Sequence, residues 1–241
     1  MSTVIELDDP TTWPTGLRSA VARTVTDARR AEPFPSDLHL TDTELWNIRD
    51  ALDGHRVLLF HAARLLPGEI EDILAGGLQM LDERLIERKI TEAASRDYIT
   101  DSQARMLIAE RAPLDGSAGR RAAQVCAIPS LRALDYGVHG VLPLMTQWGG
   151  EAIYRAHERD ALGPLLRSLG QPAIVAFSAP ALRATDLWFP RLEAVVVSIS
   201  LGLVDANADV FLRSAVPASD IRGVWLLGMP EYDAHPILPR Q

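Results

Sequence analysis

The first part of the chain has apolar residues at helical spacing. In residues 16–31 they recur every three or four positions, at Leu17, Val21, Val25 and Ala28, which predicts an amphipathic helix. A stretch with two prolines follows, and the sequence TDTE at 41–44 has the form of a capping box. We therefore expect a second helix that begins there and ends near Gly54.

The next apolar segment predicts a strand and then a helix. Residues 57–60, VLLF, form a short continuous apolar run, which is typical of a buried strand. His61 ends this run, and a turn leads into a helix with one apolar face. The pair Gly76-Gly77 ends that helix. The expected order is strand, His61, loop, helix and Gly-Gly.

The rest of the chain changes from helical to strand-rich patterns. Residues 81–111 mix charges of both signs with helix formers, which predicts a solvated pair of helices. Residues 113–121, PLDGSAGRR, predict a flexible break. One helix is expected at about 150–169, between apolar runs that predict strands. These strands are 124–128, 138–144, 173–177, 194–199, 210–212 and 224–227.

Helices followed by mostly antiparallel strands indicate the α+β fold class. A chain of 241 residues is long enough for one large domain with a helical extension. We expect an N-terminal helical extension at 1–54 and a main domain at 55–230, with the helical insert 81–111 inside it. Residues 231–241, which contain two prolines, are expected to form a surface tail.

The composition is that of a folded domain in a reducing compartment. Hydrophobic residues make up 47% of the chain and charged residues 23%, far from the composition of a disordered protein. The single cysteine cannot form an internal disulfide. The acidic N-terminal segment lacks the basic and apolar parts of a secretory signal, and no apolar run is long enough to span a membrane. We therefore expect a cytoplasmic protein without a membrane contact.

Several common chemistries lack their sequence motifs. The chain contains no G-x-x-x-x-G-K-[ST], G-x-G-x-x-G, H-E-x-x-H or G-x-S-x-G pattern. Its six histidines are scattered, so no metal site is expected. Cys126 has apolar neighbours, which indicates a buried thiol. The net charge of −8 argues against a general nucleic-acid binder, although a local basic groove is compatible with it.

Residues 56–78, RVLLFHAARLLPGEIEDILAGGL, resemble the first motif of the ADP-ribosyltransferase superfamily. In that motif an apolar strand ends in His or Arg, and the following helix closes with Ile-Leu-x-x-Gly-Leu. The resemblance implies a fold of split antiparallel sheets with NAD as a substrate. His61 would hydrogen-bond the adenosine ribose, the main chain of Ala62 would pair with the nicotinamide amide, and Arg64 would hold a pyrophosphate oxygen.

The segment 141–154, VLPLMTQWGGEAIY, resembles the second motif, a strand followed by a helix. Trp148 or Tyr154 would then stack on the nicotinamide ring. Glu151 stands in the first turn of the helix, where it is a candidate catalytic carboxylate. The alternative is a tight strand–helix turn with a core tryptophan and a glutamate that the helix dipole favours.

The segment 209–221, DVFLRSAVPASDI, resembles the closing strand of the superfamily. Members usually carry a glutamate there, which stabilises positive charge developing on the ribose. This chain has the shorter Asp209. Three interpretations stay open: Asp209 substitutes for the glutamate, Glu151 supplies the carboxylate, or the site only binds. Glu193 is a further candidate.

The resemblance implies an NAD-dependent mono-ADP-ribosyltransferase that modifies an intracellular protein or nucleic acid. Toxins of toxin–antitoxin or phage-defence systems are the nearest analogues, so an antitoxin or inhibitor protein is an expected partner. The alternative is a non-catalytic module of the same fold that binds NAD, ADP-ribose or a partner. An NAD-dependent RNA 2′-phosphotransferase is a third interpretation, which would need more basic residues than Arg64 around its phosphate.

Overall fold

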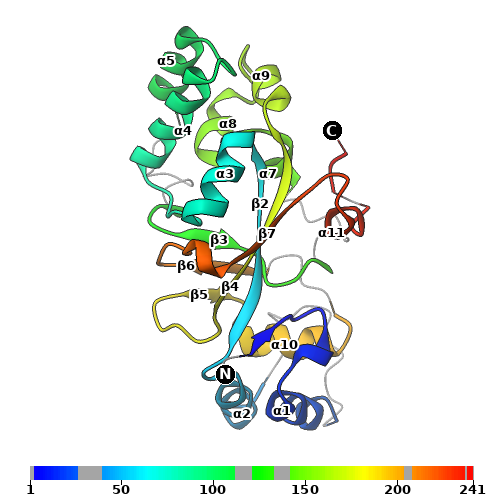
Figure 1. Ribbon diagram of the computed structural model, residues 1–241. Coiled ribbons are helices and arrows are strands. Elements are labelled where there is room, and N and C mark those ends of the chain that lie inside the picture. The colour runs from blue at the N-terminus through cyan, green and yellow to red at the C-terminus, as the bar shows by residue number, and fades with distance from the viewer. Residues whose placement is uncertain are drawn as a thin grey trace.

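The computed structural model describes residues 3–26, 40–111, 121–132, 142–203, 208–236 and 238–240. They form an α+β fold with two β-sheets. Figure 1 shows the sheets in the middle of the molecule, with one group of helices at each end. The predicted fold class is therefore confirmed at the level of α+β. Among these residues, no helix has the length and apolarity needed to cross a membrane.

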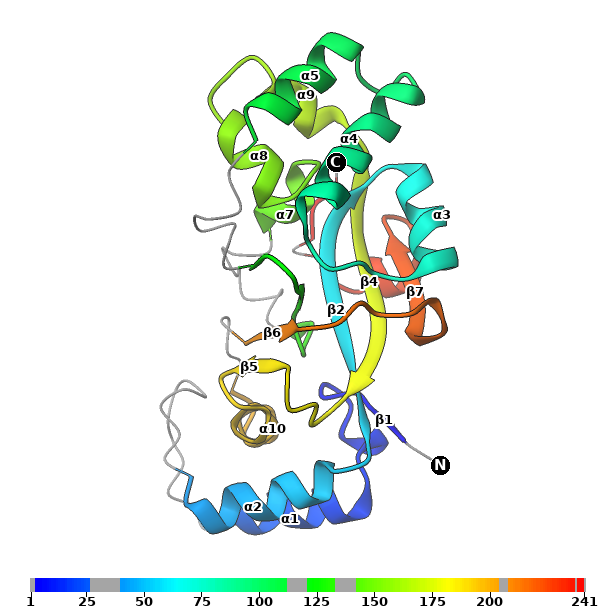
Figure 2. The same cartoon turned by 90° about the vertical axis from the view of Figure 1, so that its left-hand side faces the viewer.

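The N-terminal helices form the group at one end of the molecule. Helix α1 (Thr15–Thr26) packs against α2 (Asp42–Leu52) and α10 (Leu192–Ser200), as Figure 2 also shows. The predicted capping box of α2 is confirmed, because the Thr41 amide donates to Glu44 Oε2 at 2.7 Å and the Glu44 amide donates to Thr41 Oγ1 at 3.3 Å. The last part of the predicted helix 16–31 lies outside the described residues.

A four-stranded sheet lies at the centre of the main domain. Its order is β1 (Val4–Ile5), β2 (Arg56–Leu65), β4 (Gln171–Pro180) and β7 (Ile221–Leu226). Strands β2 and β4 pair antiparallel over ten residues, from Arg56↔Pro180 to Leu65↔Gln171. The prediction that the strand ends at His61 was wrong, because β2 continues to Leu65 and His61 lies in its middle. The residues after His61 keep the alternating pattern of a paired strand, which a short apolar run does not reveal.

The second sheet contains three antiparallel strands in the order β3 (Val125–Ala127), β6 (Asp209–Leu212) and β5 (Leu187–Phe189). One isolated bridge connects it to the first sheet. The Phe60 amide donates to the Ile128 carbonyl at 3.0 Å, and the Ile128 amide donates back at 2.8 Å. Strand β2 therefore pairs with β4 along one edge and touches the second sheet at one residue of the other edge.

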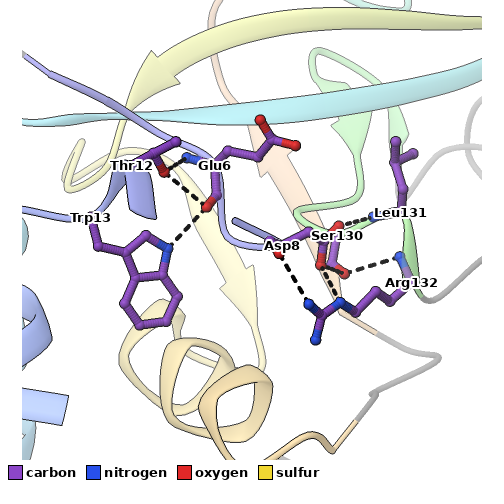
Figure 3. Close-up of polar contacts among 7 residues, drawn as sticks. All are labelled: Glu6, Asp8, Thr12, Trp13, Ser130, Leu131 and Arg132. Carbon is purple, nitrogen blue, oxygen red and sulfur yellow. Dashed lines mark hydrogen bonds and ion pairs between the residues drawn. The ribbon is translucent and has the colours of Figure 1, made fainter. Parts of the chain in front are cut away.

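The segment that leaves β3 is fastened by the N-terminal turn. Asp8 accepts hydrogen bonds from Ser130 Oγ at 2.5 Å and from the Leu131 amide at 2.7 Å, and Arg132 Nη2 donates to the Asp8 carbonyl at 3.0 Å. Figure 3 shows these contacts beside the turn closed by Trp13, whose Nε1 donates to the Glu6 carbonyl at 2.9 Å. The turn contains a 3-10 helix, η1 (Pro10–Thr12). The N-terminal residues thus position β3 next to β2.

Helices α4 (Glu83–Ser95), α5 (Asp101–Ala109), α8 (Glu151–His157) and α9 (Gly163–Ser168) form a helical lobe with its own core. Helix α3 (Pro67–Gly76) packs against β7, and α7 (Leu142–Thr146) packs against β2 and β4. Helices α4 and α5 confirm that residues 81–111 form two helices. The predicted helix 150–169 is interrupted between α8 and α9, where Asp160 accepts from the Leu162 amide at 2.7 Å and bonds His157 Nδ1 at 2.6 Å. The lobe core contains Leu66, Ile86, Ile90, Ala93, Leu107, Trp148, Ile153, Tyr154 and Leu166.

Two predicted strands are helices in the structure. Residues 194–199 belong to α10, whose residues 192–199 are all buried. A helix buried on every side has the same continuous apolar sequence as a buried strand, so periodicity cannot separate them. Residues 142–144 belong to α7, where Pro143 occupies an early helical position that favours proline. Residues 138–141 of that predicted strand lie outside the described part of the chain.

The remaining predicted strands are confirmed, as parts of β3, β4, β6 and β7. The 3-10 helix η4 (Ala218–Asp220) precedes β7. Helix α11 (Pro230–Asp233) begins the segment expected as a surface tail. It buries Tyr232, whose hydroxyl donates to the Pro239 carbonyl at 2.8 Å. Tyr232 and Leu238 therefore pack against residues of β2 and β4.

The pair Gly76-Gly77 provides a test of the fold with a built-in control. Gly77 has φ +85 and ψ −169, and a Cβ there would lie 1.9 Å from the Val216 carbonyl oxygen. Gly76→Ala adds a methyl group with no atom within 4 Å. We expect Gly77→Ala to lower the free energy of unfolding by about 2 kcal/mol or more and Gly76→Ala to raise it by about 0.5–1 kcal/mol. Urea denaturation of both variants measures this, and equal effects would contradict the close approach.

Candidate functional site

One face of the three-stranded sheet is left open. Residues paired directly across antiparallel strands share a face, and that face recurs at every second residue. The register places Leu187 and Cys126 beside Phe211, and Phe189 beside Asp209. We call these five residues the open face. Leu187 is 51% exposed and Phe189 63% exposed, whereas the opposite face of the sheet carries buried core residues such as Val210 and Leu212.

A pocket of about 390 Å³ lies against the open face. Strands β5 and β6 and the residue after β6 form one wall, and helix α8 and the segment before β3 form the other. Its volume falls in the range of small-molecule binding sites. The lining residues are Arg121, Gln124, Glu151, Arg155, Leu187, Phe211 and Arg213.

Glu151 is the carboxylate that organises the pocket wall. It is the first residue of α8 and follows a sharp turn in which Gly149 has φ +96 and Gly150 φ +66, values that favour glycine. Its Oε2 lies 3.1 Å from Arg121 Nε and its Oε1 lies 3.2 Å from Arg155 Nη2. One carboxylate therefore fixes two guanidinium groups at the pocket.

His61 is held as a neutral imidazole behind β3. Its Nδ1 lies 2.8 Å from the Cys126 carbonyl oxygen, and a carbonyl can only accept, so Nδ1 carries the proton. Burial lowers the pKa of His61, and the charges of Lys89 and Arg121 lower it further, against the opposing effect of the hydrogen bond. Nε2 then presents a lone pair and acts as an acceptor.

Cys126 lies on the open face, near the segments that carry the two candidate carboxylates. Burial raises the pKa of its thiol to about 11, and the charges of Asp209 and Glu151 add to that rise. Arg121 and Arg213 act in the opposite direction. Cys126 pairs with Phe211, which lines the pocket together with Glu151, and Asp209 lies two residues from Phe211 on the same face. The Cys126 carbonyl accepts a hydrogen bond from His61. The structure therefore brings together His61, Glu151 and Asp209.

The main chain of Ala62 faces the split between the sheets. Successive residues of a strand point their peptide groups to opposite edges. Phe60 exchanges both of its bonds with Ile128, so the N–H and C=O of Ala62 point to the same edge, away from β4. No other described residue outside the β2–β4 ladder donates to or accepts from the Ala62 main chain. This is the edge at which the sequence motif places the nicotinamide amide.

Arg64, Trp148 and Tyr154 lie in the interior instead. Arg64 is 7% exposed, and its Nε donates to the Leu169 carbonyl at 2.6 Å. Trp148 and Tyr154 are 0% and 3% exposed and belong to the core of the helical lobe. Trp148 Nε1 donates to Glu69 Oε2 at 2.8 Å. The structure thus does not place these three side chains in the pocket lining, and Glu193, at 4% exposure on α10, bonds Arg49 at 3.2 Å.

The pocket also contains residues that the motif comparison did not select, namely Arg121, Arg155, Phe211 and Arg213. For two of them the sequence carried a signal. Phe211 and Arg213 follow Asp209 at intervals of two, which places them on one side of an extended segment. Arg121 and Arg155 come from other segments, and only the fold brings them to Glu151.

A group of three potential metal ligands in the helical lobe has a simpler explanation. Atoms of Glu110, His157 and Asp160 lie within 4.8 Å of one another. The 2.6 Å contact between His157 Nδ1 and Asp160 Oδ2 is a hydrogen bond that lowers the pKa of the aspartate. The group therefore closes the turn between α8 and α9.

No protein-family model, curated protein or solved structure matches the chain.

A substitution of Trp148 tests whether its ring is part of the core or contacts a ligand. We expect Trp148→Phe to lower the free energy of unfolding by about 1–3 kcal/mol, because the partly buried Glu69 carboxylate loses a donor. Circular dichroism during urea denaturation measures this loss. Stability equal to that of the wild type would contradict the structural role.

His61 predicts a pH dependence of stability. Its pKa is lowered in the folded state, so the unfolded chain binds a proton first as the pH falls below about 6.5. The contribution to stability is present above that pH and is lost as the pH falls toward the lower folded pKa. His61→Gln should therefore lose less stability than the wild type between pH 7.5 and pH 5.5, in urea denaturation at both values. Parallel losses in the two proteins would show that His61 is not the titrating group.

Proposed function

We propose that this protein cleaves the bond between nicotinamide and ribose in NAD and transfers the ADP-ribose to an intracellular macromolecule. One observation carries the proposal. His61 and the peptide groups of Ala62 come from β2, Glu151 from α8 and Asp209 from β6, and these three segments meet where β2 separates from the second sheet. Three of these positions belong to different sequence motifs that resemble ADP-ribosyltransferases.

The arrangement of the sheets supports the same proposal. The resemblance implies split antiparallel sheets, and the described residues form two sheets that the Phe60–Ile128 bridge connects. Their strands pair antiparallel, except where the short β1 joins β2 in parallel. The motif strand β2 stands at the division, so a ligand bound there meets residues of both sheets.

The chemistry of the site suits the dinucleotide. A carboxamide has one donor and one acceptor side, which the C=O and N–H of Ala62 complement. Neutral His61 offers Nε2 as an acceptor for a ribose hydroxyl, and its lowered pKa keeps that lone pair available near neutral pH. In this proposal the pyrophosphate is not held by Arg64, whose guanidinium bonds interior carbonyls.

The reaction breaks the C1′–N bond of NAD, and the bonding electron pair leaves with nicotinamide. A nucleophilic atom of the acceptor forms the new bond to C1′ and gives up its proton to solvent. Positive charge develops on the ribose as the old bond breaks, and a nearby carboxylate stabilises it. We assign this role to Asp209, because it stands on the closing strand β6, where the resemblance expects a glutamate. Glu151 is assigned as the positioning residue of the pocket wall.

The shorter Asp209 also favours a second candidate, a module that binds NAD without cleaving it. An aspartate at that position reaches less far toward the ribose than the usual glutamate. The two candidates differ in one measurable product, free nicotinamide.

Release of nicotinamide from NAD, followed by liquid chromatography with and without cell lysate, tests the proposal. We expect Asp209→Asn to reduce the rate on the order of 100-fold and His61→Ala to raise KM. Asp50→Asn is the matched control, since Asp50 is an exposed aspartate on α2. Asp209→Glu should retain or increase the rate.

If the wild-type protein binds NAD in calorimetry but releases no nicotinamide, the result would reject the transferase and support the binding module. Binding and cleavage both absent would reject both candidates.

A further inference from the structure

We infer that the pocket against the open face binds a phosphate and base of single-stranded nucleic acid. Its assignment as the acceptor site rests on the proposed transferase activity, whereas binding itself does not. The pocket lies beside Asp209 on the same face of β6, so an acceptor held there stands next to the proposed reaction centre.

The charge of the pocket wall is the first observation. Three guanidinium groups line it, from Arg121, Arg155 and Arg213, against one lining carboxylate, Glu151. Glu151 lies 3.1 Å from Arg121 and 3.2 Å from Arg155, so it fixes both guanidinium groups beside the pocket. Fixed planar guanidinium groups are well suited to bidentate contacts with phosphate oxygens.

Arg213 supplies charge that the fold does not neutralise. It is exposed, and its guanidinium forms no ion pair or hydrogen bond with another residue in the part of the chain that the structure describes. The nearby Asp186 accepts from the Arg213 main-chain amide at 3.0 Å and lies 3.8 Å from Arg183. Asp209, on the open face, is the other acidic neighbour. Within the lining, positive charge therefore exceeds negative charge locally, although the whole chain carries −8.

The apolar side of the pocket is the second observation. Phe211 lines it beside Leu187, and Phe189 continues the same face of the sheet at 63% exposure. An exposed aromatic ring next to arginines is the combination that binds single strands, because unpaired bases stack on the ring while the cations contact the backbone. A duplex hides its base faces in the stack, and an acidic peptide offers no planar base.

A direct binding experiment tests this inference without NAD. The probe is a fluorescein-labelled oligothymidylate of about ten nucleotides, titrated with full-length protein at about 50 mM salt and followed by fluorescence anisotropy. We expect Arg213→Gln to weaken binding by about tenfold and to reduce the slope of log K against log salt by about 0.7, the value for one phosphate contact. Phe211→Ala should weaken binding by about tenfold or more, through lost stacking.

Arg105→Gln is the matched control, because Arg105 is an exposed arginine on α5 in the helical lobe. It removes the same charge and should leave the affinity near that of the wild type. If Phe211→Ala lowers the midpoint of thermal unfolding, Arg213→Gln alone decides the test, because the exposed Arg213 side chain contributes little to stability.

Three results would overturn the inference. They are absence of binding to the oligonucleotide, equal losses in Arg213→Gln and Arg105→Gln, and equal affinity for an acidic peptide or for the duplex form. Oligonucleotide binding without nicotinamide release would instead reject the transferase and keep the binding site. Nicotinamide release with no oligonucleotide binding would do the reverse.

Discussion

The pairing of β2 with β4 is the constraint on which the site depends. Ten consecutive residue pairs fix the direction of every peptide group in β2. Those of His61 are used in the ladder, whereas those of Phe60 and Ala62 face the other edge. A shift of one residue in this register would exchange the two sets and turn each side chain to the opposite face. The long ladder therefore sets which main-chain atoms of β2 face the second sheet. His61 and Ala62 can play their proposed roles only in this register.

Charge pairing sets the other half of the site. Glu151 pairs with Arg121, whose charge lowers the pKa of His61, and His61 donates a hydrogen bond to the Cys126 carbonyl. The Gly149-Gly150 turn positions Glu151, and the hydrogen bonds that Asp8 accepts hold the residues that follow β3. The site thus depends on contacts and turns in segments that are distant in sequence.

Local signals in the sequence predicted local structure well. The capping box at Thr41, the glycine turn before Glu151 and the two helices of residues 81–111 all follow from interactions within a few residues. The predictions failed where tertiary burial decided the outcome. Residues 194–199 form a helix because neighbours cover it on all sides, and β2 extends past His61 because β4 pairs with it.

The same distinction applies to the candidate site. Motif comparison selected His61, Glu151 and Asp209, which the fold brings together, and also Trp148 and Tyr154, which fill the helical core. An aromatic residue beside a glycine turn fits both environments, and only packing separates them. Arg121 was missed because its partner Glu151 is 30 positions away in the chain.

The environment of Cys126 has a consequence for chemical reactivity. Thiols are oxidised and alkylated as thiolates, and a pKa of about 11 leaves very little thiolate at neutral pH. The chain's only cysteine therefore stands beside the candidate site in a form that peroxide and electrophiles attack slowly. Its slow alkylation would also serve as a spectator signal, since any occupant that displaces Asp209 or Arg213 changes the charge around the sulfur and with it the labelling rate.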